Sequence, residues 1–424
     1  MRNDSPQASQ PAPLLDRADV RVAHASGLGE TLAAFGRRVR AGDLGSLPVV
    51  AGLIIIWTVF TSLNPVFVSA DNLVNLLFDC STVGVISLGI VCVLMVGQID
   101  LSVGSISGFA SALVGTLWVN AGWPVPLAIL AALAAGALIG ALYALLFNRL
   151  GMPSFVTTLA GLLAILGLQL YVLGPPGSIN LPYDSALVTL GQQRVLPAAV
   201  SHGLALLPGL ALVLLGLRTR ERRRAARLSA PSALGVLVRA AVITVLLELV
   251  VAYLDRGRGV PLMFALFVAL AAAMHYAMTR TRWGRSMHAV GGNHEAARRA
   301  GIHVGAIYTS AFVLCTSLAA LGGILTAARL AAARLASASQ QAGTGDVNLN
   351  AIAAAVIGGT SLFGGRGSAW SAVLGIVVIQ SIASGLTLLN LSSSLRFMIT
   401  GAVLAIAVIV DSLARRSRVS HGRA

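Results

Sequence analysis

The residues of this chain that could do chemistry are few, and most are amides, hydroxyls and acids set within or beside long apolar stretches. Polar groups at membrane depth are costly unless they are paired or line a watery path. Two of the polar stretches are glycine-containing turns, and non-helical backbone at that depth survives only where it is buried in protein or lines a cavity. The candidates for lining such a path are Asn72, Asn75, Gln98, Asp100, Ser102, Thr360 and Ser361.

Asp100 stands out among these candidates because an acid flanked by apolar sequence is costly to bury without a partner. A structural alternative stays open, since Asp100 or Ser102 could cap the helix that follows. Asn72 also has an alternative role, as an interfacial residue that opens its own helix. The sequence leaves both choices open.

Glu248 is a second isolated acid, and it lies well inside the apolar run from Leu234 to Leu254. An intramembrane carboxylate is a functional suspect by default, here as the proton relay of an ion-coupled carrier. The alternative is that helix tilt and an interfacial pairing near Asp255 and Arg256 satisfy Glu248 without any role in transport.

A short polar and basic segment, Gly291 to Ile302, separates two apolar stretches. Asn293 can cap a short helix, Glu295 falls in its positive first turn, and Gly301 can end it in a left-handed conformation. Such a helix is too polar to span a bilayer and too short to be stable alone, so we expect it to lie along the membrane surface and dock in a partner's groove. The alternative is an ordinary positive-inside loop with a turn of helix. The docking candidates are Asn293, Glu295, Ala296, Ala297, Arg298 and Gly301.

The sequence gives no sign of a self-sufficient enzyme. It shows no nucleophile and base pair, no carboxylate dyad and no metal cluster, so no catalytic or metal-binding residue is predicted. All 30 basic residues are arginine, and without lysine a GxxxxGK[ST] nucleotide loop cannot exist. Any ATP must therefore be bound and hydrolysed by a partner, and we expect no cofactor in this chain.

Cysteine and charge exclude further classes. Cys80, Cys92 and Cys315 form no CxxC pair and fall in or near apolar segments, which argues against a disulfide or a metal site. The formal net charge of +15 is spread over loops instead of being gathered on one face. We therefore expect no nucleic-acid partner.

Composition indicates which elements must position these residues. Of 424 residues, 56% are hydrophobic and only 11% are charged, and the mean hydropathy is +0.84. The apolar residues fall in long runs of membrane-spanning length. We therefore predict an all-α polytopic membrane protein with about 10 to 12 transmembrane helices, including short or broken segments.

Two of the predicted spans, Val83–Gly97 and Leu349–Phe363, have roughly 15 residues, below the roughly 20 that a straight crossing helix needs. They occupy similar places in the two halves of the chain, and each precedes a polar, glycine-rich turn. This suggests an internal repeat with paired re-entrant or broken helices. The full set of predicted spans is Leu47–Val68, Val83–Gly97, Leu101–Val119, Pro124–Phe147, Ser154–Leu173, Leu196–Leu217, Leu234–Leu254, Pro261–Met278, Gly305–Ala328, Leu349–Phe363, Ser368–Leu389 and Phe397–Val410.

The distribution of arginine predicts the orientation, because inside loops of membrane proteins are enriched in basic residues. With the N-terminus inside, Arg149, the run Arg218 to Arg227 and the stretch Arg280 to Arg299 all fall in the cytosol. We expect a mostly disordered cytosolic tail over 1–44, a transmembrane domain over 45–413 and a cytosolic tail over 414–424. Within the domain, 279–304 is the cytosolic loop that carries the docking helix.

Four motifs lie at separated places in the chain, at Gln98–Ser105, Pro153–Gly161, Gly291–Ile302 and Ala351–Leu362. Taken together and in this order, they resemble the permease subunits of bacterial ABC importers for pentoses and related sugars. The match covers about Leu47 to Arg416. Within that family the chain looks closest to the xylose-type permeases, because Arg218 to Leu254 looks like an extra pair of spans with a basic loop that ribose-type members lack.

The resemblance implies a multi-pass subunit of the bacterial inner membrane that passes a monosaccharide, xylose or a related pentose, through the lipid bilayer. It implies a second permease chain in a homodimer, a cytosolic ABC ATPase subunit that uses ATP, and a periplasmic sugar-binding protein. The helix from Glu295 to Gly301 would seat in the ATPase groove. The loop Ala331 to Val347 departs from the family pattern, and Asn350 stands where the branch commonly has an acid. An ion-coupled secondary sugar carrier acting alone, with Glu248 as relay, is the alternative.

Overall fold

The computed structural model describes residues 47–331, 338–339, 342–343, 346–392, 394–402, 405 and 409. Within these residues, nine helices are long and apolar enough to cross a membrane, and two apolar helices are shorter. The predicted all-α polytopic fold is confirmed. The predicted tails 1–44 and 414–424 lie outside the described residues, as does part of the last predicted span, Phe397–Val410.

The chain divides into two compact units. One contains the hairpin of α8 (Ala198–Ala225) and α9 (Ala233–Leu254), and the other contains the remaining described helices. The larger unit holds the polar turns and the docking segment that the sequence singles out. Its structure therefore decides how those residues meet.

Helix α3 (Ala70–Met95) forms the centre of the larger unit, and its second half is buried on every side. It packs against α13 (Val304–Leu330), which also contacts α4 (Val103–Gly115) and α5 (Val125–Leu150). Glycine permits these approaches: a Cβ on Gly89 would lie 2.8 Å from the Cys315 carbonyl oxygen, and one on Gly140 would lie 2.7 Å from that of Phe312. Close packing through small residues is the usual means of helix association in bilayers.

The outer helices of this unit show apolar side chains on their surfaces. On α5, Leu130 and Leu138 are 60% and 70% exposed, and on α6 (Ser154–Leu173) Leu163 is 66% exposed. Helix α5 has 26 residues, or about 39 Å of helix, enough to cross a hydrocarbon core of about 30 Å. Long helices with apolar outer faces are what a lipid environment requires.

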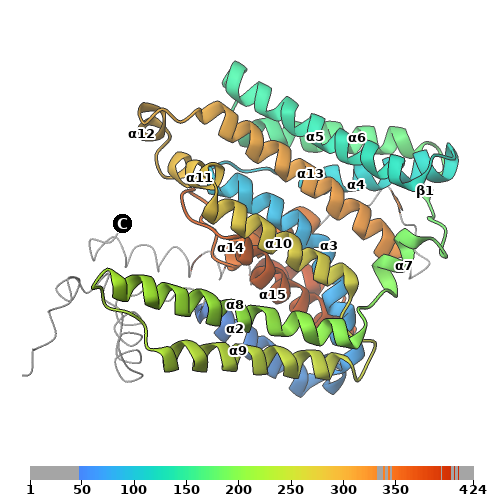
Figure 1. Ribbon diagram of the computed structural model, residues 1–424. Helices are drawn as coiled ribbons and strands as arrows, with labels where there is room; N and C mark the ends of the chain where they lie inside the picture. The colour runs from blue at the N-terminus through green and yellow to red at the C-terminus, as the bar shows by residue number, and fades with distance from the viewer. Residues whose placement is uncertain are drawn as a thin grey trace, which may run out of the picture. The chain divides into compact units, whose positions relative to one another are not determined.

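The elements of the larger unit define two ends (Figure 1). Helices α11 (Arg282–Gly292) and α12 (His294–Arg299) lie at one end, and α7 (Ala186–Gln192) and β1 (Ser178–Ile179) lie at the other. β1 pairs antiparallel with β2 (Ala338–Ser339), with Ser178 opposite Ser339. These are called the α12 end and the β1 end below.

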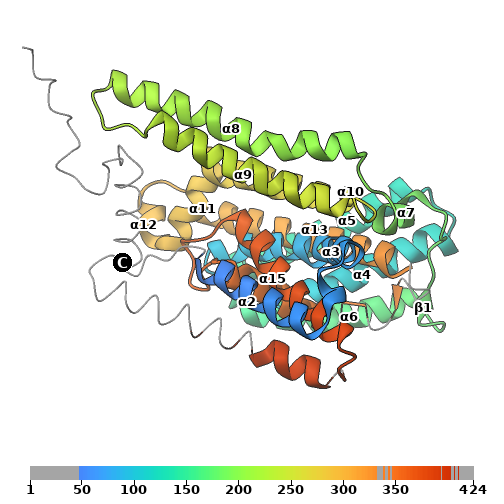
Figure 2. The same ribbon diagram turned by 90° about the horizontal axis from the view of Figure 1, so that it is seen from below.

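Helix α2 (Leu47–Leu63) runs beside α15 (Ala369–Leu388), as Figure 2 shows. The indole N–H of Trp57 donates to the Ser381 hydroxyl at 2.9 Å and ties the two helices together. A 3₁₀ turn, η1 (Pro65–Val68), then leads into α3. Helix α10 (Leu262–Arg280) completes the contacts around α3 and α15.

The prediction of two matching short spans is wrong for the first half. Val83–Gly97 is the second half of the 26-residue helix α3, which begins at Ala70. Polar residues interrupt the apolar pattern in the first half of α3. This half is still helical because side chains of other helices pair with these residues, as Arg329 does with Asp79. The second short segment is confirmed: α14 (Val347–Ile357) has 11 residues.

The predicted basic loop from Arg218 to Arg227 is largely helical, because α8 continues to Ala225. Its 28 residues give about 42 Å of helix, longer than a hydrocarbon core of about 30 Å. The arginine-bearing turns can thus extend beyond the membrane without ending the helix. Helices α8 and α9 lie where the spans Leu196–Leu217 and Leu234–Leu254 are predicted.

Candidate functional site

Helix α12 is built as its sequence predicts. Asn293 is extended, with φ −159° and ψ 103°, and its side-chain oxygen accepts a hydrogen bond from the Ala296 N–H at 2.9 Å. Gly301 has φ +83°, a left-handed conformation that glycine adopts without strain. The N–H groups of Gly301 and Ile302 donate to the carbonyls of Arg298 and Ala297, which closes the helix. The predicted cap and end of this helix are confirmed.

The faces of α12 differ from each other in character. Ala297 is 4% exposed and packs into the core of the larger unit. Glu295, Ala296 and Arg298 are exposed, and a Glu295 oxygen lies 3.4 Å from Arg298 Nη1. The surface open to a partner therefore carries charge and one small side chain, while Ala297 holds the helix down.

Helix α11 anchors this segment to the larger unit. Its buried residues Met287 and Val290 join the core, and Trp283 donates from its indole N–H to the Ser310 hydroxyl of α13 at 2.8 Å. His288 Nδ1 lies 3.3 Å from the Gly365 carbonyl oxygen. The docking segment is thus fixed to α13 and to the turn that follows α14.

The two glycine-containing turns meet at the α12 end. Gly97 and Gly364 both adopt left-handed conformations, with φ +74° and +83°. A Cβ on Gly364 would lie 2.9 Å from the Gly97 nitrogen and 2.7 Å from the Gly291 carbonyl oxygen, so only glycine fits. The Gly365 N–H donates to the Met95 carbonyl at 2.9 Å. Three motifs that lie far apart in the sequence therefore form one junction of backbone.

Asp100 is fully buried in the turn between α3 and α4. Its Oδ1 accepts hydrogen bonds from the Ser102 N–H at 2.8 Å and the Ser102 hydroxyl at 2.7 Å. Burial raises the pKa of the Asp100 carboxyl above its ordinary value, and the bonds from Ser102 and the nearby Cys315 thiol partly oppose that rise. The Ser102 side chain makes no capping bond to α4. These contacts are those of a structural turn that encloses its acid.

The turn is also held by α6. The Thr158 hydroxyl lies 3.2 Å from the Leu101 nitrogen and 3.4 Å from the Ile99 carbonyl oxygen. Thr158 is itself fully buried. The motif Pro153–Gly161 therefore supports the motif Gln98–Ser105 directly.

Thr360 and Ser361 shape the turn after α14. The Thr360 N–H donates to the Ala355 carbonyl at 3.0 Å, and its buried hydroxyl has no hydrogen-bond partner. The Ser361 hydroxyl accepts from the Phe363 N–H at 3.2 Å. Both residues lie in the junction at the α12 end.

Asn72 and Asn75 lie toward the β1 end of α3, away from the other path candidates. The Asn72 amide donates to the Phe67 carbonyl at 2.7 Å and accepts from the Ser384 hydroxyl at 3.2 Å. The Asn75 side-chain oxygen accepts from Arg258 at 2.5 Å. Both side chains are engaged in joining helices, and α3 separates them from Gln98 by about 30 Å or more.

An ion pair near these amides was missed by sequence reasoning. Arg329 of α13 donates from Nε to Asp79 Oδ1 at 2.8 Å, and its guanidinium carbon lies 5.1 Å from the centre of the Phe78 ring. Asp79 stands within an apolar run, which was a usable signal, because an acid there needs a partner. Its partner is 250 residues away in the sequence and could not be identified from spacing.

Glu248 is paired within the α8–α9 hairpin. Its Oε2 lies 2.5 Å from His202 Nδ1, and His202 Nε2 lies 3.3 Å from Asp255 Oδ2. The sequence suggested an interfacial pairing near Asp255 and Arg256, and the structure shows contacts that link Glu248 to Asp255 through His202 of α8, a residue that was not considered. Among the described residues, no group of three or more histidine, cysteine, aspartate or glutamate side chains could hold a metal ion.

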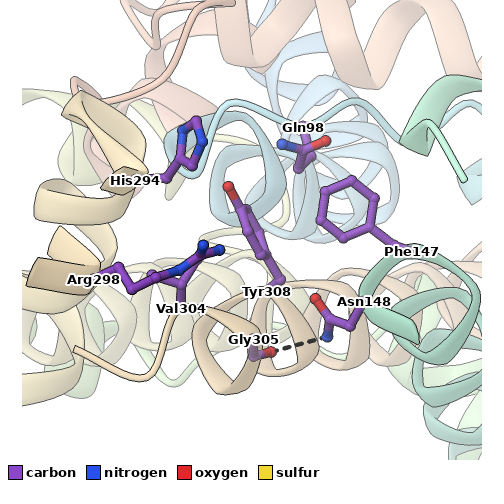
Figure 3. A pocket seen from close by; sticks show the side chains of 8 residues that line it. All are labelled: Gln98, Phe147, Asn148, His294, Arg298, Val304, Gly305 and Tyr308. Carbon is purple, nitrogen blue, oxygen red and sulfur yellow. Dashed lines mark hydrogen bonds between the residues drawn. The ribbon is translucent and has the colours of Figure 1, made fainter. Parts of the chain in front are cut away.

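Gln98 faces a cavity of about 510 Å³ beside α12 (Figure 3). Helix α5 contributes Phe147 and Asn148, and the start of α13 contributes Tyr308. Of the path candidates, Gln98 is the residue that lines this space. The full lining is Gln98, Phe147, Asn148, His294, Arg298, Val304, Gly305 and Tyr308.

Comparison with known proteins gives consistent matches over most of the chain. Residues 72–408 match the family described as branched-chain amino acid transport system / permease component. The chain is 34% identical to the xylose transport system permease protein XylH of Escherichia coli (strain K12), covering 87% of this chain and 92% of that protein.

Two further relatives come from the same strain. The ribose import permease protein RbsC is 30% identical over 85% of this chain and 91% of its own length. The probable ABC transporter permease protein YphD is 31% identical over 88% of this chain and 90% of its own length. No solved structure matches the chain.

Proposed function

This chain belongs to the family described as branched-chain amino acid transport system / permease component, in its ribose- and xylose-type branch, and we propose that it forms the membrane path of an ATP-driven pentose importer. It is a sugar ABC importer permease, a transport subunit and not an enzyme. It crosses the inner membrane several times. The sugar, the orientation and the partners are proposals.

The junction at the α12 end is the observation that carries the proposal. The exposed face of α12 is charged, and α11 connects it to the end of α3 through Gly365 and to α13 through Trp283. A partner that moves α12 would therefore move elements from both halves of the chain. Coupling then consists of different docking in two states, with ATP hydrolysis in the partner.

We expect the α12 end to face the cytosol, with both termini on that side. Between Arg280 and Arg299 the sequence holds five arginines and one acid, Glu295, which favours an inside location. A cytosolic ABC ATPase subunit would bind the exposed face of α12. A second copy of this chain would complete the path, and a periplasmic binding protein would deliver sugar at the β1 end.

Xylose is the proposed sugar. Its support is the named transport system of the XylH relative, which shares 34% identity with this chain, against 30% for the ribose import permease. The specificity need not lie in this chain, because a binding protein can select the sugar before delivery. Uptake of labelled xylose and ribose by the assembled importer would decide between them.

The experiment that tests coupling is purification of this chain from its native membrane, with ATPase subunits identified in the eluate. Glu295→Arg reverses the one acid on α12 and should abolish co-purification. Glu221→Arg, at an exposed acid of α8, is the matched control and should retain it. Failure of the unaltered chain to bring down any ATPase, or equal binding by both variants, would contradict this function for α12.

A further inference from the structure

The cavity lies between α12 and the rest of the larger unit. His294 and Arg298 enter it from α12, Val304, Gly305 and Tyr308 from α13, and Gln98 from the turn after α3 (Figure 3). Its volume of about 510 Å³ lies within the range of small-molecule sites, about 300–1,000 Å³. Anything bound there would contact both α12 and the elements that support it.

One side of the cavity is aromatic. The Phe147 and Tyr308 rings meet edge to face, with centroids 4.9 Å apart and an interplanar angle of 75°. Phe147 also lies 6.0 Å from the Phe312 ring, which fixes its position. An ordered aromatic surface of this kind suits the apolar C–H face of a sugar ring.

Groups able to hydrogen-bond hydroxyls face the same space. The Asn148 amide nitrogen donates to the Gly305 carbonyl at 3.1 Å and to the Thr309 hydroxyl at 3.2 Å, which orients the amide. Its oxygen is then directed as an acceptor. The Tyr308 hydroxyl is directed away from Asn148, towards the side of the cavity where the Gln98 amide lies (Figure 3), and these two groups interact with each other. Amide and phenol groups supply both donors and acceptors, as a polyhydroxylated ligand requires.

The remaining lining side chains favour an anion. Arg298 presents a guanidinium with a planar set of donors suited to phosphate, and His294 lies beside it. Glu295 Oε1 lies 3.4 Å from Arg298 Nη1 and 3.8 Å from His294 Nε2, and it neutralises them only in part because all three side chains are exposed. Glu295 is also the one acid between Arg256 and Asp346 in the sequence, so the segment that carries α12 and α13 has an excess of basic side chains.

We propose that this cavity binds a phosphorylated monosaccharide that enters from the side that α12 faces. The bound ligand holds α12 against the rest of the larger unit and thereby slows transport. A free sugar would leave Arg298 unused, and inorganic phosphate would leave the aromatic wall unused. A sugar phosphate uses both. Such a compound is what a kinase acting on an imported pentose would produce, so the site would report accumulated product, and ribose 5-phosphate is the pentose phosphate used as the probe. The effect on transport rests on the proposed function of α12, but the binding does not.

Binding is tested first on the purified chain without any ATPase. The probes are ribose 5-phosphate, free ribose, inorganic phosphate and adenosine monophosphate, measured by calorimetry in nanodiscs. We expect ribose 5-phosphate to bind with a Kd below about 1 mM and more tightly than the other three. Gly305→Leu should abolish binding. A Cβ on Gly305 would lie 3.7 Å from the Asn148 side chain, an ordinary van der Waals contact, so the substitution is tolerated at the Cβ while the rest of the leucine side chain fills the cavity.

Two further variants control for folding and for chemistry. Ala306→Leu makes a comparable change on an exposed position of the same helix and should leave binding intact. Tyr308→Phe keeps the aromatic contact but removes the hydroxyl, and should weaken binding roughly 3- to 10-fold. Tighter binding of adenosine monophosphate, equal binding of inorganic phosphate, or unchanged binding by Gly305→Leu would each overturn the site.

Transport is tested next in the assembled importer. Ribose 5-phosphate supplied on the α12 side should reduce ATP-driven uptake roughly 5-fold or more. The Gly305→Leu importer should take up sugar at the same rate with and without ribose 5-phosphate. Ligand binding with undiminished uptake would overturn the regulatory part. If the chain binds ribose 5-phosphate but no ATPase associates with it, the site stands and the proposed function of α12 fails.

Discussion

Replacing Gly301 by valine isolates the backbone geometry that ends α12. Gly301 has φ +83°, and a Cβ built on it would meet no atom within 4 Å. A valine side chain therefore has room in the free chain. Any cost must come from the left-handed backbone, which β-branched residues rarely adopt.

The size of the effect follows from that conformation. A left-handed backbone costs a residue other than glycine about 1–2 kcal/mol, which is a factor of roughly 5 to 30 in the population of the native helix end. The bonds at risk are those from Gly301 to Arg298 and from Ile302 to Ala297, at 3.0 and 3.1 Å. Since α12 has only six residues, losing its end displaces the whole helix.

The assay is sugar uptake per ATP hydrolysed, measured on the reconstituted importer. We expect Gly301→Val to lower this ratio roughly 5- to 30-fold, with the chain still inserted in the membrane. Gly301→Asn is the matched control, because asparagine tolerates the left-handed region, and it should stay within about 2-fold of the unaltered chain.

Two results would refute this reasoning. If Gly301→Val couples as well as the unaltered chain, the end of α12 does not transmit the movement. If Gly301→Val and Gly301→Asn lower sugar uptake per ATP hydrolysed equally, then a partner surface leaves no room for any side chain at this position. In that case the argument from backbone conformation is incorrect.

Three further predictions concern folding and coupling separately. Ala297→Asp should lower the yield of folded chain because Ala297 is buried in the core, whereas Ala296→Asp, at an exposed site, should fold normally and weaken ATPase binding; equal folded yields by size-exclusion chromatography would contradict this. The raised pKa of Asp100 means that the folded state holds its proton more tightly, so this carboxyl's contribution to stability is present below pH 3.8 and is lost as the pH rises towards the folded pKa. As the pH rises from 3.8 towards the folded pKa, the Tm of the unaltered chain should therefore fall relative to that of Asp100→Asn. Parallel curves of Tm against pH for the two proteins would disprove this. Arg329→Met should lower the Tm more than Asp79→Asn, because Arg329 also contacts Phe78 and is the more buried partner; the opposite order in a thermal-unfolding assay would count against the stacking.

The sequence predicted those features that depend on local periodicity and local caps. The bounds of α6 agree with the predicted span Ser154–Leu173, because Pro153 and Gly174 flank one uninterrupted apolar run. The cap at Asn293 and the end at Gly301 were also predictable, since each depends on a residue type suited to one backbone conformation.

Features that depend on tertiary pairing were not predictable. The predicted span Val83–Gly97 leaves out the first half of α3, where Asn72, Asn75 and Asp79 interrupt the apolar pattern, yet distant partners satisfy these side chains. The same holds for Glu248, whose histidine partner lies on the neighbouring helix of the hairpin. Spacing along one helix carries no information about which residue another helix places opposite it.

The arrangement of the candidate site shows both cases. The glycine-containing turns and the α12 segment were each recognisable, but their meeting through Gly364, Gly97 and Gly291 is a property of the folded chain. Ala297 was expected on the docking face, and it is instead buried. The side of a six-residue helix that faces inward depends on how α11 is anchored, which the sequence does not state.

The central claim is that this chain is a passive path operated from the α12 end by a partner's ATP cycle. It is tested most directly by measuring uptake of labelled xylose in sealed vesicles that contain the purified chain alone, with a proton or sodium gradient imposed and no ATP. The account predicts no accumulation above the external concentration. Sustained uphill accumulation under those conditions would contradict it.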